Sequence, residues 1–361
     1  MVLVAAFAVA PVILSHDVYS YVDYARLGVR HGLDPYVHAP QAAPTDPAYS
    51  QVTWTEATSA YGPLFTLLTY PLAWLPVAAA VAVLKALAAL AVLAIAFLVA
   101  RIAAWRGVDP LRAAAFVALN PLVLVHVVGG AHNDALTMLL ATLALAALLS
   151  GRELSAGAAT VAAIATKLSA AFIAPFALLA AAAHPPTGRN VAPSIATGRK
   201  VQALESNRPV GGWGWTFWPV VRLVGGALGM ALAVGLAAYL AFGWDWLHGF
   251  GLAGENQSRT SHMSIPITIA RISGLPSGGV RLAAVILFVA LVVYLLAWTV
   301  RGGDWVRAAA WAGFGLLLAT AWLLPWYLIW PLPLVAISRD RALQLLLLAL
   351  TAYQLGARIP L

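Results

Sequence analysis

The chain has 361 residues, of which 62% are hydrophobic and only 9% charged, whereas a soluble domain carries about 25% charged residues. Its net charge of +8 comes from basic residues scattered through short loops, which favours charges that set membrane topology over a nucleic-acid partner. The chain contains no cysteine, which excludes disulfides and thiol catalysis. Several continuous apolar runs exceed the roughly 20 residues that a helix needs to cross a bilayer, so the sequence predicts an all-α polytopic membrane protein.

The predicted helices follow one another along the whole chain, without an internal repeat. We expect them at residues 2–14, 64–80, 81–103, 113–128, 135–150, 154–183, 218–242, 280–300, 308–324, 326–338 and 342–357. They predict a bundle of about 10–12 helices that forms a single domain over residues 1–361. The first helix would rise only about 21 Å, so it is either a short first span or the true start of the chain lies upstream.

The distribution of arginine and lysine predicts the side of the membrane that each loop occupies. Thirteen of the 21 basic residues share one side, which the positive-inside rule makes cytoplasmic. They are Arg101, Arg106, Arg112, Arg152, Arg189, Arg199, Lys200, Arg208, Arg222, Arg301, Arg307, Arg339 and Arg341. For this arrangement, residues 64–80 must form a surface or re-entrant helix, and residues 154–183 must enter and return with a break near Lys167. If both runs are simple spans, half of the loops change sides and the bias weakens.

The same topology gathers the polar segments at the outer face of the membrane. Residues 15–62 form a long, locally acidic first outer loop that carries amphipathic helices, and residues 243–279 form a second outer loop. The short segments 129–134 and 324–331 lie at the same face. Residues 184–217 are rich in proline, glycine and serine and are predicted to form a cytoplasmic linker.

Asp17 stands directly after the first predicted span and before an amphipathic segment that runs from Val18 to Arg30. It is either the N-cap of that helix or a carboxylate that is held at the membrane surface as a general base. The neighbouring His16 is compatible with a base or with a metal site. Further along, Tyr61 precedes a Gly-Pro pair that starts the next helix.

The sequence GGAHNDAL at residues 129–136 places three polar side chains between long apolar runs. In one interpretation, Asn133 or Asp134 caps the helix that begins at residue 135. In the other, polar groups beside a membrane signal function, and His132 and Asp134 orient an acceptor hydroxyl or help to hold a divalent ion. The two interpretations are compatible.

Lys167 lies more than a dozen apolar residues from either end of its run, too far for a lysine stem to reach an interface from a straight helix. It is therefore expected to face a cavity or an anion. Arg259 and Arg271, in the second outer loop, suit either a phosphate or lipid headgroups. Lys85 is predicted to snorkel from near a helix end. Three tryptophans at 322, 326 and 330 are predicted to be interfacial belt residues.

Several motifs resemble those of a known family. The sequence HDVYSYVDYARLGVRHGLDPYV followed by YGPL is similar to the start of a GT-C glycosyltransferase. NPLVLVHVVGGAHNDAL and LPWYLIWPLPL resemble motifs of actinobacterial polyprenol-phosphate-mannose-dependent α-mannosyltransferases. The resemblance implies a GT-C-like helical bundle in the bacterial plasma membrane, with an active site on its extracytoplasmic side.

The resemblance also implies an inverting transfer of a sugar, with mannose favoured, from a polyprenyl-phosphate donor to a glycan or glycolipid acceptor. Asp17 would be the base, although some members carry two acidic residues where this chain has His16 and Asp17. We assign the donor phosphate to Lys167, Arg259 and Arg271. The acceptor or sugar is assigned to His16, Tyr61, His132, Asn133 and Asp134. These residues assign no cofactor with certainty, and a divalent cation stays open.

Two other classes of function compete with this prediction. A secondary transporter or flippase for a lipid-linked or polar substrate would also have broken helices and buried charges, but it predicts inverted repeats and sites near the midplane. A non-catalytic lipid-binding or scaffold protein would leave the polar segments at 15–38 and 129–134 without a shared purpose.

Overall fold

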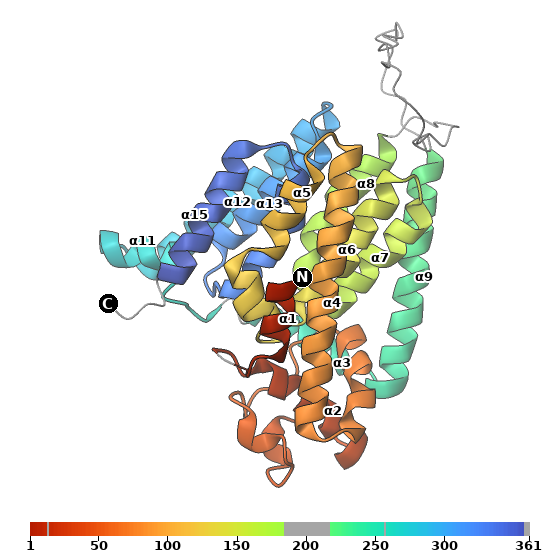
Figure 1. The fold of residues 1–361 in the computed structure, drawn as a ribbon, viewed down its shortest axis with the longest axis vertical. Helices are drawn as coiled ribbons and strands as arrows, with labels where there is room; N and C mark the ends of the chain where they lie inside the picture. Colours follow the sequence, from red (N-terminus) through yellow and green to blue (C-terminus); the bar gives the residue numbers. More distant parts are fainter. Residues whose placement is uncertain (13, 184–216, 256–257, 357–361) are drawn as a thin grey trace, which may run out of the picture.

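The computed structural model describes residues 1–12, 14–183, 217–255 and 258–356. Throughout these ranges every regular element is a helix, which confirms the predicted all-α fold class. Helices α4 (Val77–Trp105), α9 (Phe217–Phe242) and α12 (Ser277–Val300) are long and apolar enough to cross a membrane. Shorter apolar helices pack between them. In Figure 1, α4 and α9 extend along much of the length of the bundle.

The N-terminal helix α1 (Val2–Val9) is shorter than the predicted 2–14 because Pro11 forces the preceding residue, Ala10, into an extended conformation. This leaves the carbonyl group of Ala10 without a helical partner, and the ammonium group of Lys85 donates a hydrogen bond to it. Lys85 is buried inside α4, so the prediction that it snorkels is wrong.

The predicted first outer loop folds as a layer at one end of the bundle, which we call the loop end and which appears red and orange in Figure 1. It contains α2 (Asp17–His31) and the short helices η1 (Pro40–Ala42) and η2 (Tyr49–Gln51). The next two helices, α3 (Pro63–Thr69) and η3 (Tyr70–Trp74), pack against α2. The single helix predicted at 64–80 is interrupted by prolines at 71 and 76. The resulting α3 is too short to cross a membrane. This agrees with the predicted topology, in which residues 64–80 form a surface or re-entrant helix.

Helix α2 is present, but the prediction that one of its sides faces an interface is wrong. Its polar side chains Asp23 and Arg26 are buried together with its tyrosines. Nε of Arg26 lies 2.7 Å from a carboxylate oxygen of Asp46, and His31 lies 2.8 Å from the other oxygen. The loop that follows α2 therefore folds back over its polar side and covers it.

The apolar run 154–183 breaks at the predicted residue. It forms α7 (Glu153–Thr166), η5 (Leu168–Ile173) and α8 (Ala174–Ala182), with Lys167 extended between them at φ −159° and ψ 128°. Ala156 at the start of α7 and Ala180 near the end of α8 belong to one hydrophobic cluster, together with Leu148 at the end of α6 (Asp134–Leu149) and Leu223 near the start of α9. The run therefore enters the bundle and returns to the end from which it started.

Two glycines bring α7 and α9 into backbone contact at that end. A Cβ atom on Gly157 would lie 1.8 Å from the carbonyl oxygen of Leu223, and one on Gly226 would lie 1.9 Å from that of Leu154. Neither position has room for a side chain, so the helices approach as closely as their backbones allow.

The other predicted helices are recovered with interruptions. The segment 113–128 divides into α5 (Pro110–Ala118) and a π-helical turn η4 (Val123–Val128), and 326–338 divides into η7 (Pro325–Ile329) and α14 (Leu332–Ile337). Helix α15 (Arg341–Gly356) matches its prediction to within one residue, whereas α13 (Trp305–Ala319) begins three residues and ends five residues before the predicted 308–324.

The predicted second outer loop contains α10 (Trp246–Glu255) and α11 (Ile265–Ser273), the latter projecting from one side of the bundle in Figure 1. The predicted linker at 184–217 lies outside the described residues except for Phe217.

Candidate active site

A cavity of about 1370 Å³ lies where the interrupted segments meet. Its polar end is lined by Asp17 at the start of α2, by residues 53–58, 60 and 61, by Lys167 and by Arg259. The other end is an apolar arm between η5, α8, α12 and α13, lined by Phe172, Pro175, Val285, Phe288 and Leu316 among others. A cavity with one polar and one apolar end suits a substrate that has a polar head and a hydrocarbon tail.

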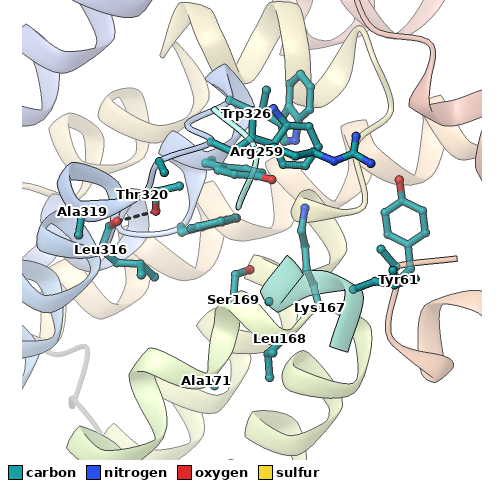
Figure 2. Close-up of a pocket in the computed structure, with 18 of the residues that line it drawn as sticks. Tyr61, Lys167, Leu168, Ser169, Ala171, Arg259, Leu316, Ala319, Thr320 and Trp326 are labelled. Carbon is teal, nitrogen blue, oxygen red and sulfur yellow. Dashed lines mark hydrogen bonds between the residues drawn. The ribbon is translucent and has the colours of Figure 1, made fainter. Parts of the chain in front are cut away.

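Lys167 enters this cavity because the helix breaks at its backbone. Figure 2 shows its side chain rising from the chain toward the aromatic residues around Trp326, with the hydroxyl group of Tyr61 directed toward the same space. Its ammonium nitrogen lies 5.1 Å and 5.8 Å from the ring centroids of Tyr327 and Trp330. The prediction that Lys167 faces a cavity is confirmed.

Gly62 explains why the helix end is held where it is. Its N–H donates to the carbonyl oxygen of Thr166 at 3.2 Å, next to the break. A Cβ atom at this position would lie 2.1 Å from the carbonyl oxygen of Ala165. The absence of a side chain at Gly62 therefore allows the chain after Tyr61 to pack against the last turn of α7.

Asp134 anchors the lysine from behind the cavity wall. Its carboxylate oxygens lie 2.7 Å and 2.9 Å from Nζ of Lys167, and one of them accepts a hydrogen bond from Nε1 of Trp330 at 2.6 Å. The side chain of Asp134 is fully buried and does not line the cavity. Asn133 stands at the N-cap position of α6, as one interpretation predicted, but its side chain makes no capping hydrogen bond, and Asp134 is already inside the helix.

Asp17 is the carboxylate that reaches the cavity. Its side chain is 17% exposed, and Oδ1 accepts a hydrogen bond of 3.4 Å from Nε1 of Trp54. Burial raises the pKa of Asp17 above its ordinary value, while the nearby charge of Lys167 and the hydrogen bond from Trp54 lower it and Asp134 raises it. The N-cap of α2 is His16, so Asp17 is not the cap.

His132 lies behind Asp17, with its Nδ1 3.7 Å from Oδ2 of that residue. Its imidazole ring is fully buried and stacks on the indole of Trp326, with ring centroids 3.8 Å apart and an interplanar angle of 17°. Asn133 approaches Lys167 at 3.5 Å through its side-chain oxygen. Because neither His132 nor Asn133 lines the cavity, the structure places residues 132–134 as a supporting layer and not as the acceptor surface that we predicted.

The remaining predicted residues divide into two groups. Tyr61 and Arg259 line the cavity. The guanidinium carbon of Arg259 lies 5.0 Å and 5.3 Å from the ring centroids of Trp54 and Trp322. His16 and Arg271 are exposed and are not among the lining residues, so the structure does not bring these two to the site.

Sequence reasoning missed several residues of the site, including three of its tryptophans. Trp326 and Trp330 are buried and line the cavity, so the prediction that they are belt residues is wrong, and Trp54, Glu56 and Arg281 also line it. The available signal was Pro325, because a helix-breaking proline inside an apolar run marks irregular backbone, which a membrane tolerates only around a protein-lined cavity.

The site offers no preformed metal centre in the part of the chain that the structure describes. No three His, Asp or Glu side chains gather there closely enough to share an ion. The carboxylates of Asp17 and Asp134 have different surroundings. Asp134 is paired with Lys167, whereas Asp17 faces the cavity. The cavity itself is lined by two carboxylates, Asp17 and Glu56, and by the cations Lys167, Arg259 and Arg281.

Residues 1–183 match the model of a family described as alpha-(1->6)-mannopyranosyltransferase, N-terminal domain. This match covers half of the chain and includes Asp17, Tyr61, Asp134 and Lys167. The chain belongs to the alpha-(1->6)-mannopyranosyltransferase family. The segment η7 and Arg259, which complete the cavity, lie outside the matched residues.

Individual members of the mannopyranosyltransferase family are also similar to the chain. Alpha-(1->6)-mannopyranosyltransferase A of Mycobacterium tuberculosis is 28% identical over 349 residues, which cover 90% of this chain and 61% of the relative. Alpha-(1->6)-mannopyranosyltransferase A of Corynebacterium glutamicum is 29% identical over 168 residues, which cover 45% of this chain and 34% of the relative. The chain thus spans less than two thirds of the length of these curated relatives. No solved structure matches it.

Proposed function

We propose that the chain is an inverting glycosyltransferase that moves mannose from a polyprenyl-phosphate donor to a hydroxyl group of a glycan or glycolipid acceptor. Membership of the mannopyranosyltransferase family supports the sugar and the type of reaction. The observation that carries the proposal is a cavity that joins the carboxylate of Asp17 and the ammonium group of Lys167 to an apolar arm.

Asp17 is the general base in this proposal. The acceptor oxygen attacks the anomeric carbon from the face opposite the phosphate, its proton passes to Asp17, and the bond between the anomeric carbon and the phosphate oxygen breaks. Polyprenyl phosphate leaves with the bonding electrons. The raised pKa of Asp17 supports this role because a carboxylate of higher pKa accepts a proton more readily.

The departing phosphate requires positive charge, which fixed cations in a water-poor site supply effectively. Lys167 and Arg259 are the two predicted cations that line the cavity. Arg281, at the start of α12, lines it as well and replaces the exposed Arg271 in our assignment. We assign the polyprenyl chain to the apolar arm, where burial of its carbons needs no polar partner.

The distribution of charge between the two ends of the bundle supports one orientation in the membrane. Arg106, Arg152, Arg222 and Arg307 flank the helix ends that lie away from the loop end. The positive-inside rule makes their side cytoplasmic. We therefore place the cavity on the extracytoplasmic side of a bacterial plasma membrane.

The test is transfer of radiolabelled mannose from polyprenyl-phosphate-mannose into endogenous acceptors by membranes that contain the wild-type chain or Asp17→Asn at equal protein level. We expect a loss of about 100-fold or more in the variant, the usual contribution of a general base. Glu153→Gln is the matched control, because Glu153 pairs with Arg222 away from the cavity. Absence of transfer by the wild type would reject the donor, and undiminished transfer by Asp17→Asn would reject the base.

A further inference from the structure

One wall of the cavity is a segment of irregular chain, residues 53–61, that the mechanism above does not use. Its backbone is held in place at three points. The hydroxyl group of Tyr24 donates to the carbonyl oxygen of Ala57 at 2.7 Å. The N–H of Gln41 donates to the carbonyl oxygen of Thr55 at 2.9 Å, and the N–H of Ser59 donates to that of Pro35 at 2.8 Å. The wall is therefore positioned before any ligand arrives.

Four polar side chains of this segment line the cavity: Thr53, Thr55, Glu56 and Thr58. Within the residues that the structure describes, none of their side-chain oxygens forms a hydrogen bond or an ion pair. Three hydroxyl groups and one carboxylate thus offer both donors and acceptors to whatever occupies the space.

These side chains decide which part of the substrate belongs at this wall. A hydrocarbon chain packed here would remove water from the carboxylate and hydroxyl groups without replacing its hydrogen bonds, at a cost of several kcal/mol for the carboxylate alone. The apolar arm on η5, α12 and α13 is lined mainly by carbon, including Phe172, Val285 and Phe288, and its polar exceptions are Ser169 on η5 and Arg281 on α12. The polar wall therefore suits a ligand with many hydroxyl groups.

The wall also lies beside the proposed base. Trp54 stands between Thr53 and Thr55 in the chain, and its indole N–H donates to Asp17 at 3.4 Å. We propose that residues 53–58 form the binding site for the acceptor sugar, a pyranose whose hydroxyl groups bind Glu56 and the three threonines while one hydroxyl reaches Asp17. This inference rests on the proposed glycosyl transfer, and it moves acceptor recognition from residues 132–134 to the first loop.

The experiment measures steady-state transfer to a synthetic α-1,6-linked mannose disaccharide, with purified full-length protein and polyprenyl-phosphate-mannose. We expect Glu56→Gln to raise the KM for the disaccharide about tenfold, as loss of a hydrogen bond to a charged group can do, and Thr55→Val to raise it about fivefold, as loss of a neutral hydrogen bond can do, while the KM for the donor changes less than twofold. Glu153→Gln, outside the cavity, is the matched control for the loss of a carboxylate. An unchanged acceptor KM in both cavity variants would overturn the inference, and the unchanged donor KM shows that a variant is folded.

Direct binding of the disaccharide to the same purified proteins separates this inference from the proposed reaction. If the wild type binds the disaccharide, Glu56→Gln weakens that binding and no mannose is transferred, the acceptor site stands and the proposed reaction fails. If the wild type transfers mannose but Glu56→Gln and Thr55→Val bind the disaccharide as it does, the reaction stands and the acceptor site fails. If the wild type neither binds nor transfers, both are overturned.

Discussion

Lys167 and Asp134 form an ion pair in which only the cation reaches the cavity. The carboxylate is fully buried, and it is held on one side by the ammonium group at 2.7 Å and on the other by the indole N–H of Trp330 at 2.6 Å. The pair connects the break after α7 to the start of α6 and to η7, so it fixes three segments at once.

This arrangement predicts that the two residues are coupled in stability. Lys167→Met leaves the carboxylate of Asp134 buried without its counter-ion, and we expect a loss of about 3–5 kcal/mol in the free energy of unfolding. The double variant Lys167→Met with Asp134→Leu removes both charges and should recover much of that loss. Thermal unfolding of the detergent-solubilised proteins measures both effects. Equal destabilisation by the single and double variants would show that the pair contributes no coupling.

The position of Asp17 predicts the pH dependence of mannose transfer. A base must be deprotonated, so the rate should rise with pH through the pKa of Asp17, which burial raises. The charge of Lys167 and the N–H of Trp54 both lower this pKa. Trp54→Phe, which keeps an aromatic ring but loses the donor, should therefore move the acidic limb of the profile to higher pH.

Trp322→Phe is the matched control for that profile. It changes a tryptophan that also contacts Arg259, but the hydrogen bond to Asp17 comes from Trp54. Profiles of kcat/KM for wild type, Trp54→Phe and Trp322→Phe between about pH 4 and 9 test the assignment. A shift to lower pH in Trp54→Phe, or the same shift in both variants, would contradict it.

Asp23 predicts a pH-dependent stability that is separate from catalysis. Burial and the charge of Asp46 raise its pKa to about 7, against the lowering effects of His31 and Arg26. Because this folded-state pKa lies above the unfolded value, the folded state retains the proton more strongly, and stability is lost as pH rises from about 4 to 7. Asp23→Asn should therefore stabilise the protein by a few kcal/mol at pH 8 and hardly at all at pH 4.

The comparison for this prediction is Asp46→Asn. Hydrogen bonds from Arg26, the backbone of Ala48 and His31 lower the pKa of Asp46, so its charged form stabilises the fold above the unfolded pKa. Its replacement should destabilise the protein at pH 8, where replacement of Asp23 stabilises it. Melting temperatures at pH 5 and pH 8 distinguish the two, and a stabilising effect of Asp46→Asn would count against this account of the cluster.

The sequence predicted those features of the fold that depend on local composition. The apolar runs located the spans, and the isolated Lys167 located the break after α7, because a charge in an apolar run needs a cavity. Prolines explain most of the boundary errors, such as the division of 64–80 near Pro71, since their effect on helix length depends on how neighbouring segments pack.

Only some charged residues of the candidate site could be predicted from the sequence, and which residues line the cavity and which stand behind it could not. Asp17 and Lys167 were identified because charge is costly beside a membrane. Whether Asp134 would face the cavity or stand behind it depends on a contact with Trp330, which is 196 residues away. Glu56 also could not be predicted, because in the sequence it is only one of several acidic residues in the loop 15–62. Its position on the cavity wall depends on how that loop folds.

The close contact between α7 and α9 at Gly157 and Gly226 has a consequence for how the helices stay associated. Much of α9 is exposed, with Leu228, Leu232, Leu236 and Leu240 at its surface. Lipid tails are as apolar as these leucines, so burying the leucines against other helices would be no more favourable than leaving them in the lipid. The hydrophobic effect therefore does not drive α9 onto its neighbours. Close packing at the two glycines holds α9, together with contacts such as the ion pair between Arg222 and Glu153. A side chain at either glycine would push the two helices apart and weaken the attachment of α9. The native structure therefore depends on the side-by-side association of the helices as well as on the formation of each helix.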